Sequence, residues 1–446
     1  MHKPLFTLIT LLTINATALA THPASAPTTS APTPRQTQVA AKPVHIDAIV
    51  AQTLALSPEL RFYENEIACA AERRTTTGRW NDPELSVEIG RKSSREANGI
   101  YAGDGLAWSV TLAQRFDFSG RNALRKAIAE KQIERAQAGL EQFRRELGAR
   151  AAELAHALLA AQQRLEATEE CVARTQAVLA SLAQREPSGI LSVLEMRVIE
   201  AGLKKLSYEA VTQRARLSMA LGDLNLLRGL PPASPLSLAN ETNAPVEAPA
   251  DASLLATAFR SNYTLRQYEL ELQEQGIALD LERKNLFNEV TLSAYYSEEK
   301  AGAKDRAFGL GASLPLPLWN RNAASISEAR SRQGQAETAL FRMRRDLHKE
   351  LLAAAALYRA NQSFLCENNA VELARFHEAA AQAERHYRLG AIPMATYLGL
   401  QQAYLEMVEL HTTARTEAIR AAAQISILAG LPLQHFFPST AKGGAQ

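Results

Sequence analysis

Two long stretches without proline limit what this chain can fold into more than any other feature of its sequence. No proline occurs between Glu84 and Glu186, and none occurs between Leu318 and Ile392. Within them, residues 121–185 and 321–388 have apolar residues at helical spacing. A helix of about 65 residues is roughly 100 Å long, far longer than a globular domain needs. The sequence therefore predicts a coiled-coil-like assembly of very long helices.

The two stretches belong to two copies of one unit. The sequence FRREL begins at Phe143, and MRRDL begins at Met343, 200 positions later. Apolar residues around both motifs keep this offset at steps of three and four, as in a near-heptad helix seam. The matched pairs are Leu140 and Leu340, Phe143 and Met343, Leu147 and Leu347, Ala151 and Leu351, Leu154 and Ala354, and Leu158 and Tyr358. The triplet Arg121-Asn122-Ala123 matches Arg321-Asn322-Ala323 at the same offset, which indicates an internal duplication.

Each half predicts the same order of elements. A helix leads to a strand, a polar glycine-containing loop and a second strand, and the long helix and one more helix follow. The predicted ranges in the first half (44–230) are a helix at 45–79, strands at 84–90 and 107–118, a loop at 91–105, and helices at 121–185 and 191–228. Those of the second half (251–435) are a helix at 251–285, strands at 289–296 and 307–318, a loop at 297–306, and helices at 321–388 and 394–429. A proline-rich linker (231–250) joins the halves, and a tail (436–446) follows them.

The longer strands have one apolar and one polar face. In the first half Trp108, Val110, Leu112, Phe116 and Phe118 alternate with Ser109, Thr111, Ala113, Arg115 and Asp117. In the second half Phe308, Leu310, Ala312, Leu314, Leu316 and Leu318 alternate with Gly309, Gly311, Ser313, Pro315 and Pro317. About 11 residues with this alternation are typical of a transmembrane β-strand, although hairpins of a soluble β-domain have the same pattern. Four strands cannot close a barrel in lipid, so chains must pool strands, and three chains leave room for a channel where two do not.

The N-terminus predicts export. Lys3 precedes an apolar run from Leu5 to Leu12, and Ala18-Leu19-Ala20 follows, as in a secretory signal peptide over residues 1–20. The alternative is a disordered apolar N-terminus. Residues 21–43 are rich in Pro, Thr and Ala and indicate a flexible tether.

Composition and motifs argue against other classes of function. A formal net charge of +2 gives no reason to expect a nucleic-acid partner. His377-Glu378 begins like a zinc-protease helix, but position 381 is Ala381, so His377 is interpreted as a helix-surface residue. We find no catalytic motif, metal site or cofactor site. Cys69, Cys171 and Cys366 lack metal-ligand spacing and are interpreted as small buried residues, with a Cys171–Cys366 bridge as the alternative.

Several stretches resemble the TolC family of outer-membrane efflux channels, and the resemblance extends over residues 44–435. These stretches are ALSPEL (Ala55–Leu60), NDPELSVEIG (Asn81–Gly90), LPLPLWNRNAASISEA (Leu314–Ala329) and RLGAIPMATYLGLQQA (Arg388–Ala403). The third is similar to the strand-to-helix junction of the heavy-metal-cation branch, the cobalt-zinc-cadmium or copper-silver type. The fourth is similar to the helix-turn-helix at the periplasmic end of the family's tunnel.

The resemblance implies an α plus transmembrane β fold in a homotrimer. A 12-stranded β-barrel would lie in outer-membrane lipid, continuous with a 12-helix periplasmic α-barrel. The closed end of the tunnel would dock on a periplasmic adaptor protein and, through it, on an inner-membrane proton-driven pump. The chain would then be a passive exit duct for heavy-metal cations, without chemistry of its own.

Two groups of residues are expected to matter in such a channel. At the barrel–tunnel junction, Pro315 and Pro317 lie where a strand must bend, Asn320 and Asn322 flank Arg321 where a helix needs an N-cap, and Ser119 with Arg121 and Asn122 holds this place in the first half. At the periplasmic tips, the resemblance implies that Arg185, Gly189, Arg388 and Gly390 contact the adaptor, although Gly390 also suits a helix C-cap. The first tip departs from the family pattern, because it is Arg185-Glu186-Pro187-Ser188-Gly189.

Two other functions remain open from the sequence. The same kind of channel exports organic solutes, drugs or polypeptides when it works with another pump. A structural coiled-coil protein of the periplasm is the second alternative, and it requires that the hairpins stay soluble.

Overall fold

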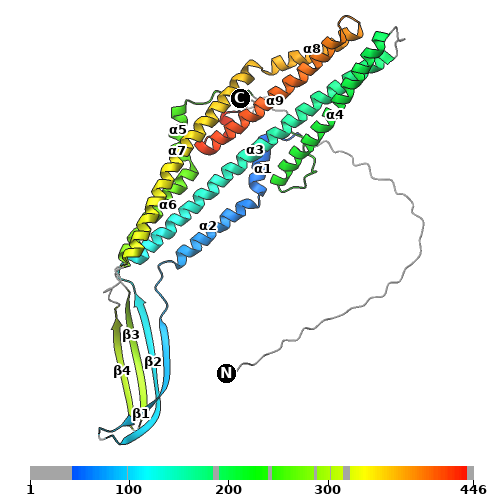
Figure 1. Cartoon of the computed structure of the whole chain (residues 1–446). Coiled ribbons are helices and arrows are strands. Elements are labelled where there is room, and N and C mark those ends of the chain that lie inside the picture. Colours follow the sequence, from blue (N-terminus) through cyan, green and yellow to red (C-terminus); the bar gives the residue numbers. More distant parts are fainter. Residues whose placement is uncertain are drawn as a thin grey trace, which may run out of the picture. The chain divides into compact units, whose positions relative to one another are not determined.

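Long helices make up most of the chain (Figure 1). The structure is a computed structural model that describes residues 43–97, 99–183, 190–239, 244–285, 289–301, 303–314 and 322–438. The expected signal peptide, nearly all of the expected tether and the end of the tail lie outside these residues.

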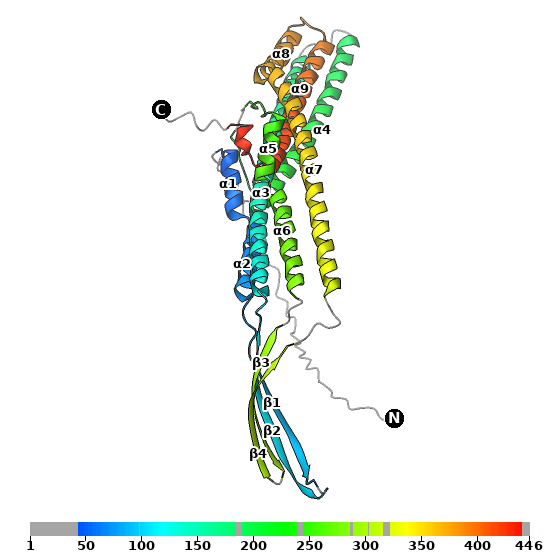
Figure 2. The same ribbon diagram turned by 90° about the vertical axis from the view of Figure 1, so that its left-hand side faces the viewer.

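The helices form an extended bundle within the described residues (Figures 1 and 2). The longest, α3 (Arg121–Ala183), has 63 residues and packs along α4, α6 and α9. The others are α1 (Ile46–Leu56), α2 (Glu59–Thr76), α4 (Ile190–Leu227), α5 (Asp251–Ser261), α6 (Tyr263–Lys284), α7 (Ala323–Glu367), α8 (Ala370–Arg388), α9 (Met394–Ala429) and the short η1 (Leu433–His435). Across the described ranges, none of these helices combines the length and the apolarity of a membrane span.

Three of the predicted helices are interrupted, so their prediction as single helices was wrong. Residues 45–79 form α1 and α2, which are separated at Pro58, a residue that cannot donate a backbone hydrogen bond. Residues 251–285 are divided at Asn262, whose side chain accepts a hydrogen bond from the Leu265 backbone N–H at 2.7 Å and starts α6. Residues 321–388 are divided at Asn369, which caps α8 in the same way.

The seam predicted from the duplication is buried in both halves. Leu140, Leu147, Ala151 and Leu158 of α3 are buried, and so are Leu340, Leu347, Leu351 and Tyr358 at the matching positions of α7. Ala354 is also buried, whereas Phe143, Leu154 and Met343 are partly buried and pack against clusters of buried residues. The two helices therefore use equivalent faces to form the core, as an internal duplication requires.

The strands form one antiparallel sheet in the order β1-β2-β3-β4 (Figure 2). Their bounds are β1 (Glu84–Arg95), β2 (Tyr101–Phe116), β3 (Val290–Ala301) and β4 (Ala303–Ser313). The hairpin of each half is joined to the other by the pairing of β2 with β3, in which Val110 lies opposite Tyr296. The sheet lies at the end of the helices where α3 begins.

The two expected charged loops, 91–105 and 297–306, are largely strand. The first hairpin is strand over residues 91–95 and 101–105, and the second is strand over the described residues of 297–306. Charged side chains there pair across the ladder: Glu298 accepts from the Lys304 ammonium at 2.6 Å and from the Arg306 guanidinium at 3.1 Å. Charge and glycine content predicted loops, but cross-strand ion pairs make these residues compatible with strands.

The cysteines are free thiols, which excludes the Cys171–Cys366 bridge from this structure. Cys171 is buried as predicted, and burial raises the pKa of its thiol to about 12. Cys69 and Cys366 are exposed, so their interpretation as buried residues was wrong.

A buried histidine in α3 predicts that stability falls in acid. Burial, and to a smaller extent the charge of Arg415, lowers the pKa of His156 to about 3. Between that value and the unfolded value of about 6.5, the unfolded chain binds a proton that the folded chain does not, so stability decreases as pH falls. At pH 5 the expected loss is about 2 kcal/mol relative to neutral pH.

This loss is measured from denaturant unfolding at pH 7 and pH 5, for the native protein and for His156→Gln. The variant should lack this part of the pH dependence. His386→Gln, which replaces an exposed histidine of α8, is the control and should behave like the native protein. An equal pH dependence in all three would contradict the assignment to His156.

Candidate functional site

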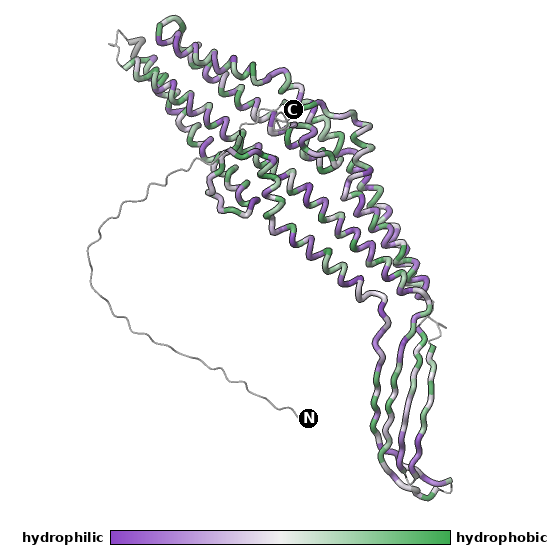
Figure 3. Tube along the Cα trace, turned by 180° about the vertical axis from the view of Figure 1, so that it is seen from behind, coloured by the Kyte–Doolittle hydropathy of each residue, from purple (hydrophilic) through white to green (hydrophobic). Residues whose placement is uncertain are grey.

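The sheet has one face of large apolar side chains, which we call the apolar face. Its large apolar members are Leu85, Val87, Ile89, Leu106, Trp108, Val110, Leu112, Phe116, Val290, Leu292, Tyr296, Phe308 and Leu310. Exposed fractions reach 73% for Ile89 and 83% for Leu310. Hydrophobic and hydrophilic residues alternate along the strands, as Figure 3 shows. An apolar surface this extended is normally covered by a partner or by lipid.

The opposite face, which we call the polar face, carries mostly Ser, Thr, Gly and Ala. Its charged residues along the regular ladder of described residues are the acids Glu84, Glu88, Glu299 and Asp305 and the cations Lys92 and Arg115. Four carboxylates against two cations leave a net charge of −2. Two of the acids are paired closely, Glu84 with Arg115 and Glu299 with Lys92. The alternation predicted for the two longer strands is thus confirmed within β2 and β4, and it extends to all four strands. The predicted alternation ran on to Asp117 and Phe118, but β2 ends at Phe116.

Both outer strands of the sheet leave one edge unpaired. Among the residues that the structure describes, β1 has a neighbour only in β2, and β4 has a neighbour only in β3. Unpaired backbone N–H and C=O groups at an edge favour pairing with another strand, and lipid does not tolerate them.

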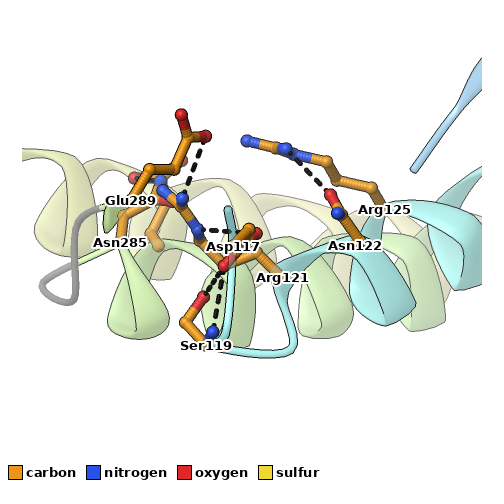
Figure 4. Close-up of polar contacts among 8 residues, drawn as sticks. Asp117, Ser119, Arg121, Asn122, Arg125, Asn285 and Glu289 are labelled. Atoms are coloured by element: carbon orange, nitrogen blue, oxygen red, sulfur yellow. Dashed lines mark hydrogen bonds and ion pairs between the residues drawn. The ribbon is translucent and has the colours of Figure 1, made fainter. Parts of the chain in front are cut away.

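The guanidinium of Arg121 joins the two halves of the chain where the strands meet the helices (Figure 4). The residue is 7% exposed and begins α3. It donates to Asp117 Oδ2 at 3.2 Å, to Glu289 Oε1 at 3.1 Å and to Asn285 Oδ1 at 3.3 Å. Asp117 follows β2, whereas Asn285 and Glu289 lie between α6 and β3. One side chain therefore fixes the start of the longest helix to both hairpins.

The carboxylate of Asp117 is held in its charged form. Ser119 donates to Asp117 Oδ1 from its backbone N–H at 3.0 Å and from its hydroxyl at 2.6 Å. Burial alone would raise the pKa of Asp117, but these hydrogen bonds and the charge of Arg121 outweigh it and lower the pKa. The junction thus contains a buried, hydrogen-bonded ion pair.

The structure corrects the expected role of Ser119. Its hydroxyl bonds to Asp117, and α3 begins after Gly120, which has a left-handed φ of 76°. Asn122, one residue into the helix, accepts a hydrogen bond from Arg125 at 3.2 Å.

Asn322 occupies the predicted N-cap position of α7 but makes no capping hydrogen bond with its side chain. Its φ of 52° is left-handed, a conformation that asparagine tolerates better than most residues. Its amide donates instead to the Glu282 carbonyl and carboxylate, both at 3.0 Å, and so ties α7 to α6. Pro315, Pro317, Asn320 and Arg321 lie outside the described residues.

The far end of the bundle is a tight helical hairpin between α8 and α9. Gly390 follows α8 with a φ of 73°, and its N–H bonds to the Tyr387 carbonyl at 2.9 Å. The Ala391 N–H bonds to the His386 carbonyl at 2.9 Å, which completes a Schellman motif. The Arg388 side chain forms an ion pair with Glu384 at 2.6 Å. Gly390 is therefore a helix C-cap, and Arg185 and Gly189 of the other expected tip lie outside the described residues.

Two stacked tyrosine rings hold this hairpin together. Tyr387 and Tyr397 lie 5.3 Å apart at an interplanar angle of 11°, and both are buried. Gln401 donates to the Tyr397 hydroxyl at 2.8 Å and accepts from Thr175 of α3 at 3.1 Å. The hairpin is thus attached to α3.

Replacing Gly390 tests how much this tip depends on the left-handed residue. Gly390→Ala should lower stability by about 1–2 kcal/mol, because an L-residue is strained at this φ. Hydrogen exchange of the α8–α9 hairpin would report the loss. Gly399→Ala within α9 is the matched control and should not lower stability, because alanine is favoured inside a helix. Equal protection in Gly390→Ala and the native protein would contradict a strained cap.

A second polar link joins α3 to α8. The Nε2 atom of His377 lies 2.9 Å from Glu170 Oε1 and 3.0 Å from Arg174 Nη2. Burial opposes the ionisation of Glu170, but hydrogen bonding to His377 and the charge of Arg174 lower its pKa. His377 is partly exposed on the helix, as predicted, but the sequence did not indicate its partners. Among the described residues no cluster of His, Cys, Asp or Glu has the arrangement of a metal site.

Comparisons with known proteins agree with this architecture. Residues 49–227 match the model of the outer membrane efflux protein family. CusC, which forms a transmembrane channel, is 17% identical over 85% of this chain and 92% of its own, with a TM-score of 0.66. The outer-membrane channel OprN is 20% identical over 87% and 90%, with a TM-score of 0.69. The Campylobacter jejuni outer-membrane channel CmeC is 12% identical over 86% and 85%, with a TM-score of 0.68.

A search of curated protein sequences found no match. The family match lies in the first half of the chain, and the structural likeness extends over both halves. They support the TolC-type architecture that the sequence resembles. At identities of 20% and below, this structural likeness shows that the chain has the fold of these outer-membrane channels.

Proposed function

We propose that three copies of this chain form a passive exit duct for heavy-metal cations, supplied by an inner-membrane proton-driven pump through a periplasmic adaptor protein. The observation that carries the proposal is the two-faced sheet with open edges. Its apolar face suits lipid, and its polar face suits water.

Strand number favours the trimer. β4 of one copy is free to pair with β1 of the next, because each is an edge strand in the chain. Two copies give eight strands, whose interior side chains fill, whereas three copies give twelve and leave an open lumen. The number of long helices agrees with a trimer. Among the described residues, each chain has four long helical segments, if α7 and α8 are taken together as one: α3, α4, α7–α8 and α9. Three copies then give a tunnel of twelve.

The charge of the polar face supports a cationic cargo. A net charge of −2 on each chain becomes −6 in the trimer, inside a lumen with low-dielectric walls that concentrate the field. Such a field raises the local concentration of cations. The likeness of Leu314–Ala329 to the heavy-metal-cation branch points in the same direction.

The hairpin between α8 and α9 supports docking of an adaptor at the far end. The exposed Leu389, at 79%, lies between Arg388 and Gly390 at the turn. We propose that this turn and the equivalent turn at Arg185 and Gly189 contact the adaptor.

Metal content of a deletion strain tests the cargo. Cells lacking the chain are challenged with zinc, cadmium, cobalt, nickel, copper and silver, beside a panel of dyes and antibiotics. We expect higher cellular metal with unchanged drug sensitivity, and restoration by the native gene. Drug sensitivity without metal accumulation would replace the cation proposal with an organic-solute channel.

The membrane fraction separately tests the architecture. Heat-resistant trimers in outer-membrane fractions are expected. Extraction of the native chain by carbonate would instead support a soluble periplasmic coiled coil and overturn the channel.

A further inference from the structure

A belt of charged residues continues the apolar face beyond its aromatic side chains. Trp108 and Tyr296 pack together with ring centroids 5.4 Å apart, and Phe308 lies opposite Tyr296. Farther from the helices, the same face carries a set of residues that we call the cationic belt. Its members among the described residues are Arg91, Lys300, Lys304 and Arg306 with the acids Asp104 and Glu298. Four cations against two acids leave a net charge of +2, opposite in sign to that of the polar face.

The cations of the belt project farther into the surroundings than the acids do. Side-chain exposure is 79% for Arg91 and 62% for Arg306, against 21% for Glu298. Glu298 binds Lys304 and Arg306 with its two carboxylate oxygens. The acid therefore orients two cations and leaves their remaining N–H donors outward.

Two lysines of the belt face each other directly. Lys300 and Lys304 are partners in the β3–β4 register, and like charges in such a pair destabilise a sheet. On the polar face the acids Glu299 and Asp305 form the corresponding like-charged pair, and Lys92 of β1 pairs closely with Glu299 and lies 4.0 Å from Asp305. On the belt, an external anion between the lysines would have the same effect.

We propose that the cationic belt binds the phosphate groups of phosphorylated glycolipid headgroups in the outer leaflet of the outer membrane. The inference rests on the proposed barrel, in which the apolar face meets lipid. Aromatic side chains of membrane barrels lie at the level of the headgroups, and the belt lies directly beyond them on the side away from the periplasmic helices. Arginine and lysine bind phosphate oxygens strongly, and arginine does so with two parallel hydrogen bonds. The occupant is therefore a lipid phosphate and not a soluble partner.

The test compares the full-length trimer in vesicles of phospholipid with added lipid A and in vesicles with lipid A from which both phosphates have been removed. The temperature at which the trimer dissociates in detergent should be higher after the first reconstitution. Lys300→Gln/Lys304→Gln/Arg306→Gln should abolish this difference. Lys92→Gln removes one lysine from the polar face and should preserve it. If the triple variant does not assemble, Lys300→Gln alone is used in its place. It leaves both ion pairs of Glu298 intact and should reduce the difference in dissociation temperature.

Ion conductance in phospholipid alone separates this inference from the proposed function. A chain that neither inserts nor conducts would contradict the channel itself. A native trimer that conducts ions but is equally stable with both forms of lipid A would overturn the proposal that the cationic belt binds lipid phosphate. It would leave the proposed channel unaffected. The phosphate-binding proposal would also be overturned if Lys300→Gln and the triple variant kept the full difference in dissociation temperature between the two forms of lipid A.

Discussion

Arg121→Met lowers the free energy of unfolding by about 3–5 kcal/mol, because it leaves a buried carboxylate without its cation. The side chains of Arg121 and Asp117 are 8% and 7% exposed, so water replaces little of the lost interaction. The same substitution releases Glu289 and Asn285, which lie between α6 and β3 of the second half. Denaturant unfolding of the purified protein, with the dissociation temperature of the proposed trimer, measures the loss. Arg74→Met is the control, since Arg74 pairs with Glu130 while both are about half exposed, and its loss should be about 0–1 kcal/mol.

A second substitution shows whether the buried charge causes the loss. Asp117→Asn combined with Arg121→Met removes both charges and should recover much of the stability. A double variant as unstable as Arg121→Met would instead assign the loss to packing or to Glu289. The lowered pKa of Asp117 sets the pH range of the effect. Its stabilisation is complete above the ordinary aspartate pKa of about 3.9 and is lost as pH falls through the folded value.

The duplication allowed the sequence to predict the main elements but not the contacts between them. Leu147 and Leu347 share a position in the repeat and are both buried, because helical periodicity alone decides which side chains form a seam. Arg121 was predicted to lie at the junction because its triplet recurs at Arg321. Its acceptor Glu289 lies 168 positions away, and nothing local in the sequence connects the two.

The turns were predicted less well, for a related reason. Asn262 and Asn369 interrupt helices because their side chains bind backbone N–H groups, a competition that apolar periodicity does not register. Charged residues near Glu298 were assigned to a loop, since their pairing partners belong to the next strand. Short-range patterns therefore predict elements, whereas caps, strand ends and ion pairs depend on partners that only the fold brings together.

Glu88→Gln combined with Asp305→Asn should remove the cation preference that we propose for the channel. The two substitutions change the net charge of the polar face from −2 to 0 in each chain, and therefore from −6 to 0 in the trimer. Neither acid has a close ion pair: Glu88 accepts from Ser109 at 3.4 Å, and Asp305 lies 4.0 Å from Lys92. The fold should thus tolerate both changes. The reversal potential in a potassium chloride gradient should show a severalfold lower ratio of cation to anion permeability.

Salt dependence and a matched variant make this result specific. The difference from the native channel should be large at low ionic strength and small at about 1 M salt, where charges are screened within about 3 Å. Asp104→Asn removes a carboxylate from the opposite face of the sheet and should leave the permeability ratio unchanged. An unchanged ratio in the double variant would mean that the polar face does not line the pore.

The same double variant separates the contribution of the proposed duct from that of the proposed pump. In the deletion strain it should export metal less well than the native gene, because the lumen no longer concentrates cations. The order of sensitivity among the six metals should stay the same, since a diffuse negative field distinguishes charge and not coordination chemistry. A changed order would indicate that residues of this chain bind the metals individually. Equal metal export with a lost permeability preference would mean that the pump alone determines the flow, and that the acids of the polar face serve another purpose.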